Sequence, residues 1–158
     1  MNKRIALMLA ALVILPTLAG MAIDLEARIG TGPSAMVTAA WDMSSNLSIA
    51  ASFGVSGFGA AVQSGSATVQ TPSYTVNIRA TYTFLPTTSR IRPYFGIGGN
   101  VDFTGGTLIP FLETTLGLRA EITPSIYVLG EASAYFRIPD VADWYWRARL
   151  GIGFHLRF

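Results

Sequence analysis

The sequence predicts an all-β protein, an eight-stranded antiparallel up-and-down transmembrane β-barrel. Apolar side chains recur at every second position through most of the chain, and an export signal precedes the first such segment. Charged residues make up only 13% of the 158 residues, against about 25% in an average soluble domain. This shortage of charge indicates that much of the outer surface does not face water, and the chain is long enough for a single domain.

The first 22 residues predict a cleaved signal peptide. A short positive segment at residues 2–4 is followed by an apolar run at residues 5–15, which ends before Pro16. Small residues at 20–22 fit a signal-peptidase site. Because the apolar run is shorter than the roughly 20 residues that a spanning helix needs, a cleaved signal is preferred over a membrane anchor. The barrel domain is then residues 23–158.

The last segment of the chain shows the alternation most clearly. From Trp144 to Phe158 every even-numbered residue is apolar, and the residues between them include Arg147, Arg149 and His155. Successive side chains of a strand point to opposite faces, so one face is apolar throughout and the other is polar. Fifteen residues is also long for a soluble domain, where strands of about five or six residues are usual.

Seven further segments alternate in the same way and complete a set of eight predicted strands. They are residues 23–30, 35–42, 47–56, 74–84, 91–103, 112–122 and 126–138.

The connections between these strands differ at the two ends of the predicted barrel. If the first strand starts in the periplasm, the short turns at 44–46, 85–90 and 123–125 are periplasmic. The external connections are 31–34, 57–73, 104–107 and 139–143, of which only Gly57–Ser73 is long. That segment carries no charge, and it is either a mobile loop or a hairpin that protrudes beyond the membrane.

Charge placement decides which face of the barrel points inward. After residue 22 the chain has no Lys, and its nine Arg balance nine acidic residues, most of them on the polar faces of strands. Buried charges must be paired, and the planar guanidinium of Arg suits this role. The predicted lumen ion-pair network consists of Asp24, Glu26, Arg28, Asp42, Arg79, Arg92, Asp102, Glu113, Arg119, Glu121, Glu131, Arg137, Arg147, Arg149, His155 and Arg157.

Aromatic residues gather near the two ends of the apolar faces, as they do in the aromatic girdles of membrane barrels. The predicted girdle consists of Trp41, Tyr74, Tyr82, Phe84, Phe103, Phe136, Trp144, Trp146 and Phe158.

Two motifs make the chain similar to a known superfamily. Residues 92–99, Arg-Pro-Tyr-Phe-Gly-Ile-Gly-Gly, resemble the Pro-Tyr-x-Gly-x-Gly strand of the small eight-stranded outer-membrane barrels, which include the OmpA membrane domain and OmpX-like proteins. The final strand ends on an aromatic residue, and the resemblance implies that Phe158 is the signal read by the barrel-assembly machinery. The resemblance spans residues 23–158 and implies localisation in the bacterial outer membrane.

Several classes of function are disfavoured by the residues. The neutral barrel domain lacks the basic surplus of a nucleic-acid-binding protein, and the absence of Cys excludes disulfides and metal–thiolate sites. Gly96, Gly98 and Gly99 precede no helix and no Lys, so they are not a phosphate-binding loop. The single histidine, His155, has no Ser within two positions, which disfavours a serine–histidine pair. We therefore expect no catalytic residues, no metal and no cofactor.

The remaining functions follow from an enclosed, charge-balanced lumen. We expect a non-enzymatic, structural or surface-interacting barrel protein with a largely plugged lumen. A small pore or hydrophobic-solute channel is the second hypothesis, and a lipid A-modifying enzyme is the third. The expected partners are outer-membrane lipid and, during biogenesis, the barrel-assembly machinery, with the mature protein a monomer.

Overall fold

The computed structural model describes residues 23–31, 34–57, 60–63, 66–69, 72–85 and 88–156. The predicted signal peptide, residues 1–22, lies outside the described residues, as do Arg157 and Phe158.

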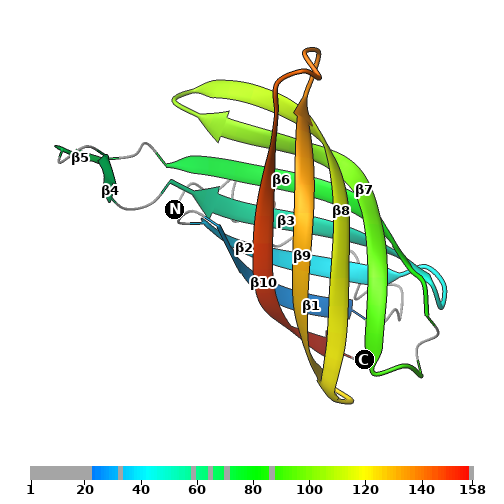
Figure 1. Ribbon diagram of the computed structural model, residues 1–158. Coiled ribbons are helices and arrows are strands. Elements are labelled where there is room, and N and C mark those ends of the chain that lie inside the picture. The colour runs from blue at the N-terminus through cyan, green and yellow to red at the C-terminus, as the bar shows by residue number, and fades with distance from the viewer. Residues whose placement is uncertain are drawn as a thin grey trace, which may run out of the picture.

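Eight of the ten described strands form one closed antiparallel barrel, in which β1 pairs with β10 to complete the ring (Figure 1). The predicted eight-stranded up-and-down barrel is therefore confirmed. The barrel strands are β1 (Ile23–Gly30), β2 (Ser34–Asp42), β3 (Leu47–Ser56), β6 (Ser73–Thr83), β7 (Ile91–Thr104), β8 (Thr107–Thr123), β9 (Ile126–Arg137) and β10 (Trp144–Leu156).

No helix in the described part of the chain is long and apolar enough to cross a membrane.

One strand is longer than the sequence predicts. β8 begins at Thr107 and not at residue 112, because its pairing with β7 continues to the tight turn between Thr104 and Thr107. Gly105 and Gly106 both have positive φ, as a two-residue type I′ turn requires. The side chain of Phe111 points inward and is buried, so an aromatic residue on the polar face interrupts the alternation at this point.

The long connection between β3 and β6 contains a second, separate sheet. β4 (Ala60–Gln63) and β5 (Ser66–Val69) pair with each other and with no barrel strand (Figure 1). Of the two alternatives for this segment, the structure has the hairpin. We call the end of the barrel that carries it the hairpin end, and the end at Ile23 and Leu156 the terminal end.

The register places the apolar residues outside and the polar residues inside. Ile29, Ile78, Leu116 and Leu150 are each more than 60% exposed on the outer face. Inward-facing residues are buried and mostly polar, and the charged ones among them are Asp24, Glu26, Arg28, Arg79, Arg92, Asp102, Glu113, Glu131 and Arg149. The core of this protein is thus a polar lumen, and its outer surface has the apolar character of a lipid-facing belt.

We predict that the folded barrel migrates faster than the boiled protein on a detergent gel, because the closed sheet resists unfolding in detergent. Protease added to the outside of intact cells should cut only within residues 57–72. Cuts at the terminal-end turns, 43–46 or 123–125, would show that the barrel has the opposite orientation.

Candidate functional site: the barrel lumen

The lumen is built from the inward-facing positions of the strands, where every second residue points to the barrel axis. Glu131 on β9 lies at its centre, and its side chain is fully buried. It forms ion pairs with Arg28 of β1 at 2.7 Å, Arg79 of β6 at 3.1 Å and Arg149 of β10 at 3.1 Å. The hydroxyl of Tyr94 on β7 donates a hydrogen bond to the same carboxylate at 2.9 Å. One carboxylate therefore joins side chains from five of the eight barrel strands.

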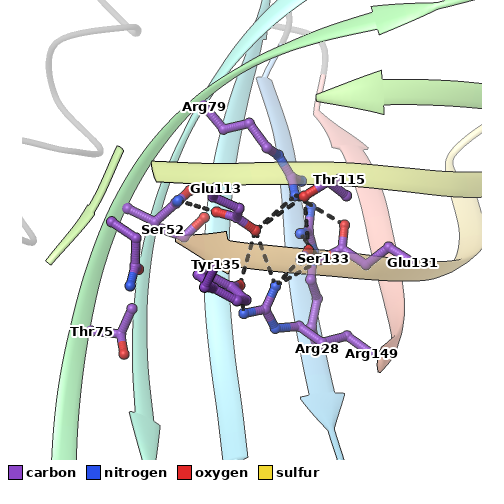
Figure 2. A network of polar contacts seen from close by, with 12 residues as sticks. Arg28, Ser52, Thr75, Arg79, Glu113, Thr115, Glu131, Ser133, Tyr135 and Arg149 are labelled. Carbon is purple, nitrogen blue, oxygen red and sulfur yellow. Dashed lines mark hydrogen bonds and ion pairs between the residues drawn. The ribbon is translucent and has the colours of Figure 1, made fainter. Parts of the chain in front are cut away.

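Glu113 on β8 extends this network towards the hairpin end. In Figure 2 its side chain lies among those of Arg79, Tyr135 and Arg149. It lies 3.4 Å from Arg149 and 3.7 Å from Arg79, so it shares both guanidinium groups with Glu131. The Tyr135 hydroxyl donates to it at 2.9 Å, and the hydroxyl of Thr115 donates at 3.1 Å. The lone pairs of this buried carboxylate are thus filled by donors, as burial requires.

Glu26 on β1 extends the network towards the terminal end. It pairs with Arg28 and, at 3.1 Å, with Arg119, and it accepts a hydrogen bond from the Tyr127 hydroxyl at 2.7 Å. The guanidinium of Arg119 also lies 4.2 Å from the centre of the Tyr127 ring, in a cation–π arrangement.

Two smaller groups of ion pairs lie nearest the terminal end. Asp24 binds Arg119 at 2.9 Å and the Nδ1 atom of His155 at 2.5 Å. Arg92 of β7 pairs with Glu121 of β8. Together with the pairs around Glu26, Glu113 and Glu131, these contacts bring eleven of the sixteen residues of the expected network into one ion-paired cluster.

Four members of the expected network either do not join this cluster or lie outside the described residues. Arg137 is exposed at the hairpin-end rim, where it pairs with Asp143 at 3.1 Å, and Asp42 is exposed at the terminal end. Both residues lie at strand ends, where the lumen opens to solvent. Arg147 forms no ion pair with a described acidic residue and stacks on Tyr145 at 4.9 Å. Arg157 lies outside the described residues.

Asp102, also expected in the network, is buried in the lumen but forms no ion pair among the described residues. It accepts hydrogen bonds from three neutral donors instead: Thr75 at 2.7 Å, Asn100 at 3.0 Å and Tyr145 at 3.3 Å. Asp102 therefore belongs to the lumen but not to its ion pairs.

The tyrosines of the network occupy space that cross-strand glycines leave free. Tyr94 faces Gly117 on β8, and Tyr127 faces Gly153 on β10. A methyl group at either glycine would overlap the facing tyrosine ring. Gly96 leaves room for Arg79 in the same way, so the glycines of the Pro-Tyr-x-Gly-x-Gly strand serve packing inside the lumen. Because these pairs depend on register, the pattern within a single strand does not reveal them.

Two small cavities lined by described residues flank the central cluster. A cavity towards the terminal end, lined by Ala40, Ala50 and Arg92, has room for about one water molecule. A second cavity towards the hairpin end, lined by Ser34, Thr75 and Arg147, is equally small. Arg28 lines both cavities and therefore lies between them.

The predicted girdle residues lie on the outer face at both ends. Tyr82 and Phe84 are exposed at the terminal end and pack edge to face at 5.6 Å, with Trp41 half-buried nearby on β2. At the hairpin end Tyr74, Phe103, Trp144 and Trp146 are exposed, and Phe136 stacks on Trp144 at 6.3 Å. Phe158 lies outside the described residues.

The lumen shows little that resembles a catalytic arrangement. His155 is held by Asp24, and its other ring nitrogen lies 3.8 Å from Glu121, with no serine hydroxyl among its contacts in the described part of the chain. Within the described ranges, no group of three or more His, Asp or Glu side chains is placed to hold a metal ion.

Solved structures with the same fold include proteins of the bacterial outer membrane. The N-terminal β-barrel domain of Pseudomonas aeruginosa OprF matches with a TM-score of 0.66 and 14% identity, covering 86% of this chain and 96% of that one. Neisserial surface protein A matches with a TM-score of 0.59 and 18% identity, covering 89% and 98%. A major outer membrane protein from Thermus thermophilus matches with a TM-score of 0.52 and 13% identity, covering 86% and 98%.

No protein-family model matches the sequence, and no curated protein matches it significantly.

We predict that Glu131→Gln lowers the free energy of unfolding by about 3–5 kcal/mol, because three buried guanidinium groups lose their shared carboxylate. Urea unfolding in lipid vesicles measures this change. The matched control is Asp143→Asn, which removes the exposed partner of Arg137 and should cost less than about 1 kcal/mol. Equal losses in the two variants would contradict the central role of Glu131.

We also predict that Gly117→Ala destabilises the barrel by about 1–3 kcal/mol, because the new methyl group displaces Tyr94 and breaks its hydrogen bond to Glu131. The same urea experiment measures the loss. Gly99→Ala is the control, since a Cβ at that position meets open space. A Gly117→Ala barrel as stable as the Gly99→Ala barrel would argue against the close packing of Tyr94 on Gly117.

Proposed function

We propose that this chain, which has the fold of the small eight-stranded outer-membrane β-barrels, is a non-enzymatic protein with a structural or surface-interacting role and a plugged lumen. Its localisation in the bacterial outer membrane follows from the barrel fold together with its apolar outer face. The observation that carries the proposal is the Glu131 cluster, which fills the middle of the barrel with side chains from five strands.

The charge balance of the cluster supports a static plug. Arg28, Arg79, Arg119 and Arg149 face the same number of carboxylates, those of Asp24, Glu26, Glu113 and Glu131. Moving any one guanidinium removes an ion pair from at least one buried carboxylate, which is costly. An ion crossing the lumen has to open this cluster, because the cavities on each side hold only about one water molecule.

The small-pore hypothesis depends on Arg28. This side chain lies between the two cavities, so a path through the lumen along β2 and β3 passes it. The facing residues there, Thr38 and Ser52, are small and bonded to each other at 2.9 Å. Arg28 is therefore the residue whose loss should connect the cavities most directly.

The enzyme hypothesis finds less support. The buried glutamates of the lumen are held by Arg, Tyr and Thr donors, which disfavours a role for them as general acid or base. His155 lies at the terminal end and is held by Asp24. In the predicted orientation this end is periplasmic and faces away from the outer leaflet.

The proposed partners follow from the two surfaces of the barrel. The apolar belt contacts outer-membrane lipid, and the final strand is the segment presented to the barrel-assembly machinery. The uncharged β4–β5 hairpin lies away from the barrel strands, and we assign any surface interaction to it (Figure 1). The mature protein is proposed to act as a monomer.

We predict that the refolded protein gives at most small and rare conductance steps in planar bilayers, because the Glu131 cluster closes the lumen. Arg28→Ala should give larger or more frequent steps, since it joins the two cavities. Arg137→Ala, which alters only an exposed rim pair, is the matched control. Large steady openings of the wild-type protein would overturn the plugged lumen and favour the pore.

A further inference from the structure

An apolar groove lies on the outer face of the barrel across β10, β1, β2 and β3. It has a volume of about 620 Å³, within the range of about 300–1,000 Å³ that is usual for small-molecule sites. Small side chains form its floor, Ala27 and Ala35, between the bulkier Leu150, Ile152 and Phe53. A groove of this kind accepts an extended apolar chain, and the outward-facing residues that line it offer no polar side chain to bind anything else.

The hairpin-end cavity of the lumen lies directly behind this groove. The two spaces share Arg28 of β1 together with Ala35, Met36, Gly54 and Val55, so the wall between them is formed mainly by β2 and β3. Gly54 contributes no side chain to that wall. At the top of the wall are Ser34 and Ser56, which pair with each other where β2 begins and β3 ends.

The cavity behind the wall is cationic. Arg28, Arg147 and Arg149 line it together with the hydroxyl-bearing residues Ser34, Ser56 and Thr75, and no carboxylate of the described residues does. Arg28 and Arg149 are paired with glutamates deeper in the lumen. The Oγ atom of Ser34 is buried and has no hydrogen-bond partner among the described residues.

Arg147 is a cationic side chain of the lumen that takes no part in the ion pairs. All nine acidic side chains of the chain lie in the described ranges, and none of them forms an ion pair with Arg147. Its guanidinium instead lies over the rings of Tyr145 and Tyr135, at 4.9 and 5.7 Å. The nearby carboxylate of Asp102 is already occupied by Thr75, Asn100 and Tyr145.

At this place the neighbouring strands β1 and β10 end at different heights. β1 ends at Gly30, which pairs with Arg149, whereas β10 continues beyond Arg149 to Trp144. Arg147 therefore lies at the level of the rim beside β1, where the Thr31 amide binds the Ala148 carbonyl at 2.8 Å. The groove and the cavity therefore lie on the two sides of the wall next to this rim.

We propose that the groove and the cavity together form one site for a single-chain amphiphile with an anionic head group, drawn from the surrounding membrane. The acyl chain lies in the outer groove, and the head group crosses the rim at Ser34 and Ser56 to bind Arg147. Because the cavity itself holds only about one water molecule, the head group stays at its mouth, and a compact group such as a carboxylate fits better than a bulky one. The site rests on the membrane placement of the barrel but not on a closed lumen.

The test is a methyl NMR titration of the folded protein in nanodiscs of zwitterionic phosphatidylcholine, with dodecanoate as the probe at a pH of about 9, where the carboxylate is ionised. We expect saturable shifts of the methyl groups of Ile29, Val55 and Leu150, which line the groove. The methyl groups of Ile97 and Leu116, exposed on β7 and β8, should not show saturable shifts. Dodecanol, which lacks the charge, should bind at least about tenfold more weakly.

Two kinds of variant separate the head-group and chain contacts. Arg147→Gln should weaken dodecanoate binding at least about tenfold, Arg147→Lys should restore part of it, and Arg137→Gln should leave it unchanged. Ala35→Leu, an exposed substitution that fills the groove, should weaken dodecanoate and dodecanol alike. Heat-modified gel migration verifies that each variant is folded.

Non-saturable shifts of equal size around the whole belt would overturn the site, since they indicate ordinary partitioning into the bilayer. Equal affinity of the wild type and Arg147→Gln would overturn the head-group contact. Neither result changes the conductance expected from a closed lumen, so failure of this site and failure of the proposed function are distinguishable.

Discussion

The ion pairs of Glu131 hold the interior of this barrel together. A closed barrel satisfies its backbone hydrogen bonds between strands. In this barrel the apolar side chains face outward, and the core is built mostly from polar side chains. Charges buried in such a core are costly unless ion pairs or hydrogen bonds compensate them. Glu131 meets this requirement through Arg28, Arg79, Arg149 and Tyr94, which come from four other strands. The same contacts that balance the charge also fill the middle of the lumen.

The rest of the interior is arranged around this constraint. Glu113 and Glu26 share the arginines of Glu131 on its two sides, and tyrosine hydroxyls complete their hydrogen bonds. The tyrosines that face glycines across the sheet fit because those glycines leave room for their rings. Arg147 lies beyond the last of these ion pairs and has no acidic partner among the described residues. For this reason we propose that an external anion binds at the rim beside β1.

Alternation predicted the fold well because the side-chain period of a strand is two and the outer face is apolar throughout. The bounds of β1 and β3 agree with the structure, and those of most other barrel strands differ by one or two residues. β8 is the exception, because Phe111 points inward and breaks the pattern that the other strands keep. The β4–β5 hairpin carries too little patterning in its Gly- and Ser-rich sequence to be distinguished from a loop.

The sequence predicted which residues share the lumen face, but not which of them meet. Partners such as Arg28 and Glu131 are on strands far apart in the sequence, and their contact depends on the relative shift of strands and on side-chain reach across the lumen. Arg137 is on the polar face of β9, but it lies at the end of the strand and pairs there with Asp143. Alternation alone therefore does not show whether an inward-facing residue lies in the buried middle of the barrel or at one of its exposed ends.

A double-mutant cycle between Glu131 and Arg79 measures how much their buried ion pair stabilises the barrel. Glu131→Gln and Arg79→Gln are made singly and together, and each protein is unfolded by urea in lipid vesicles. If the buried pair holds the lumen together, the coupling free energy exceeds about 1.5 kcal/mol, the lower end of the range for close charge pairs. A coupling near zero would show that the two side chains contribute to the stability of the barrel independently and that their ion pair does not hold the lumen together.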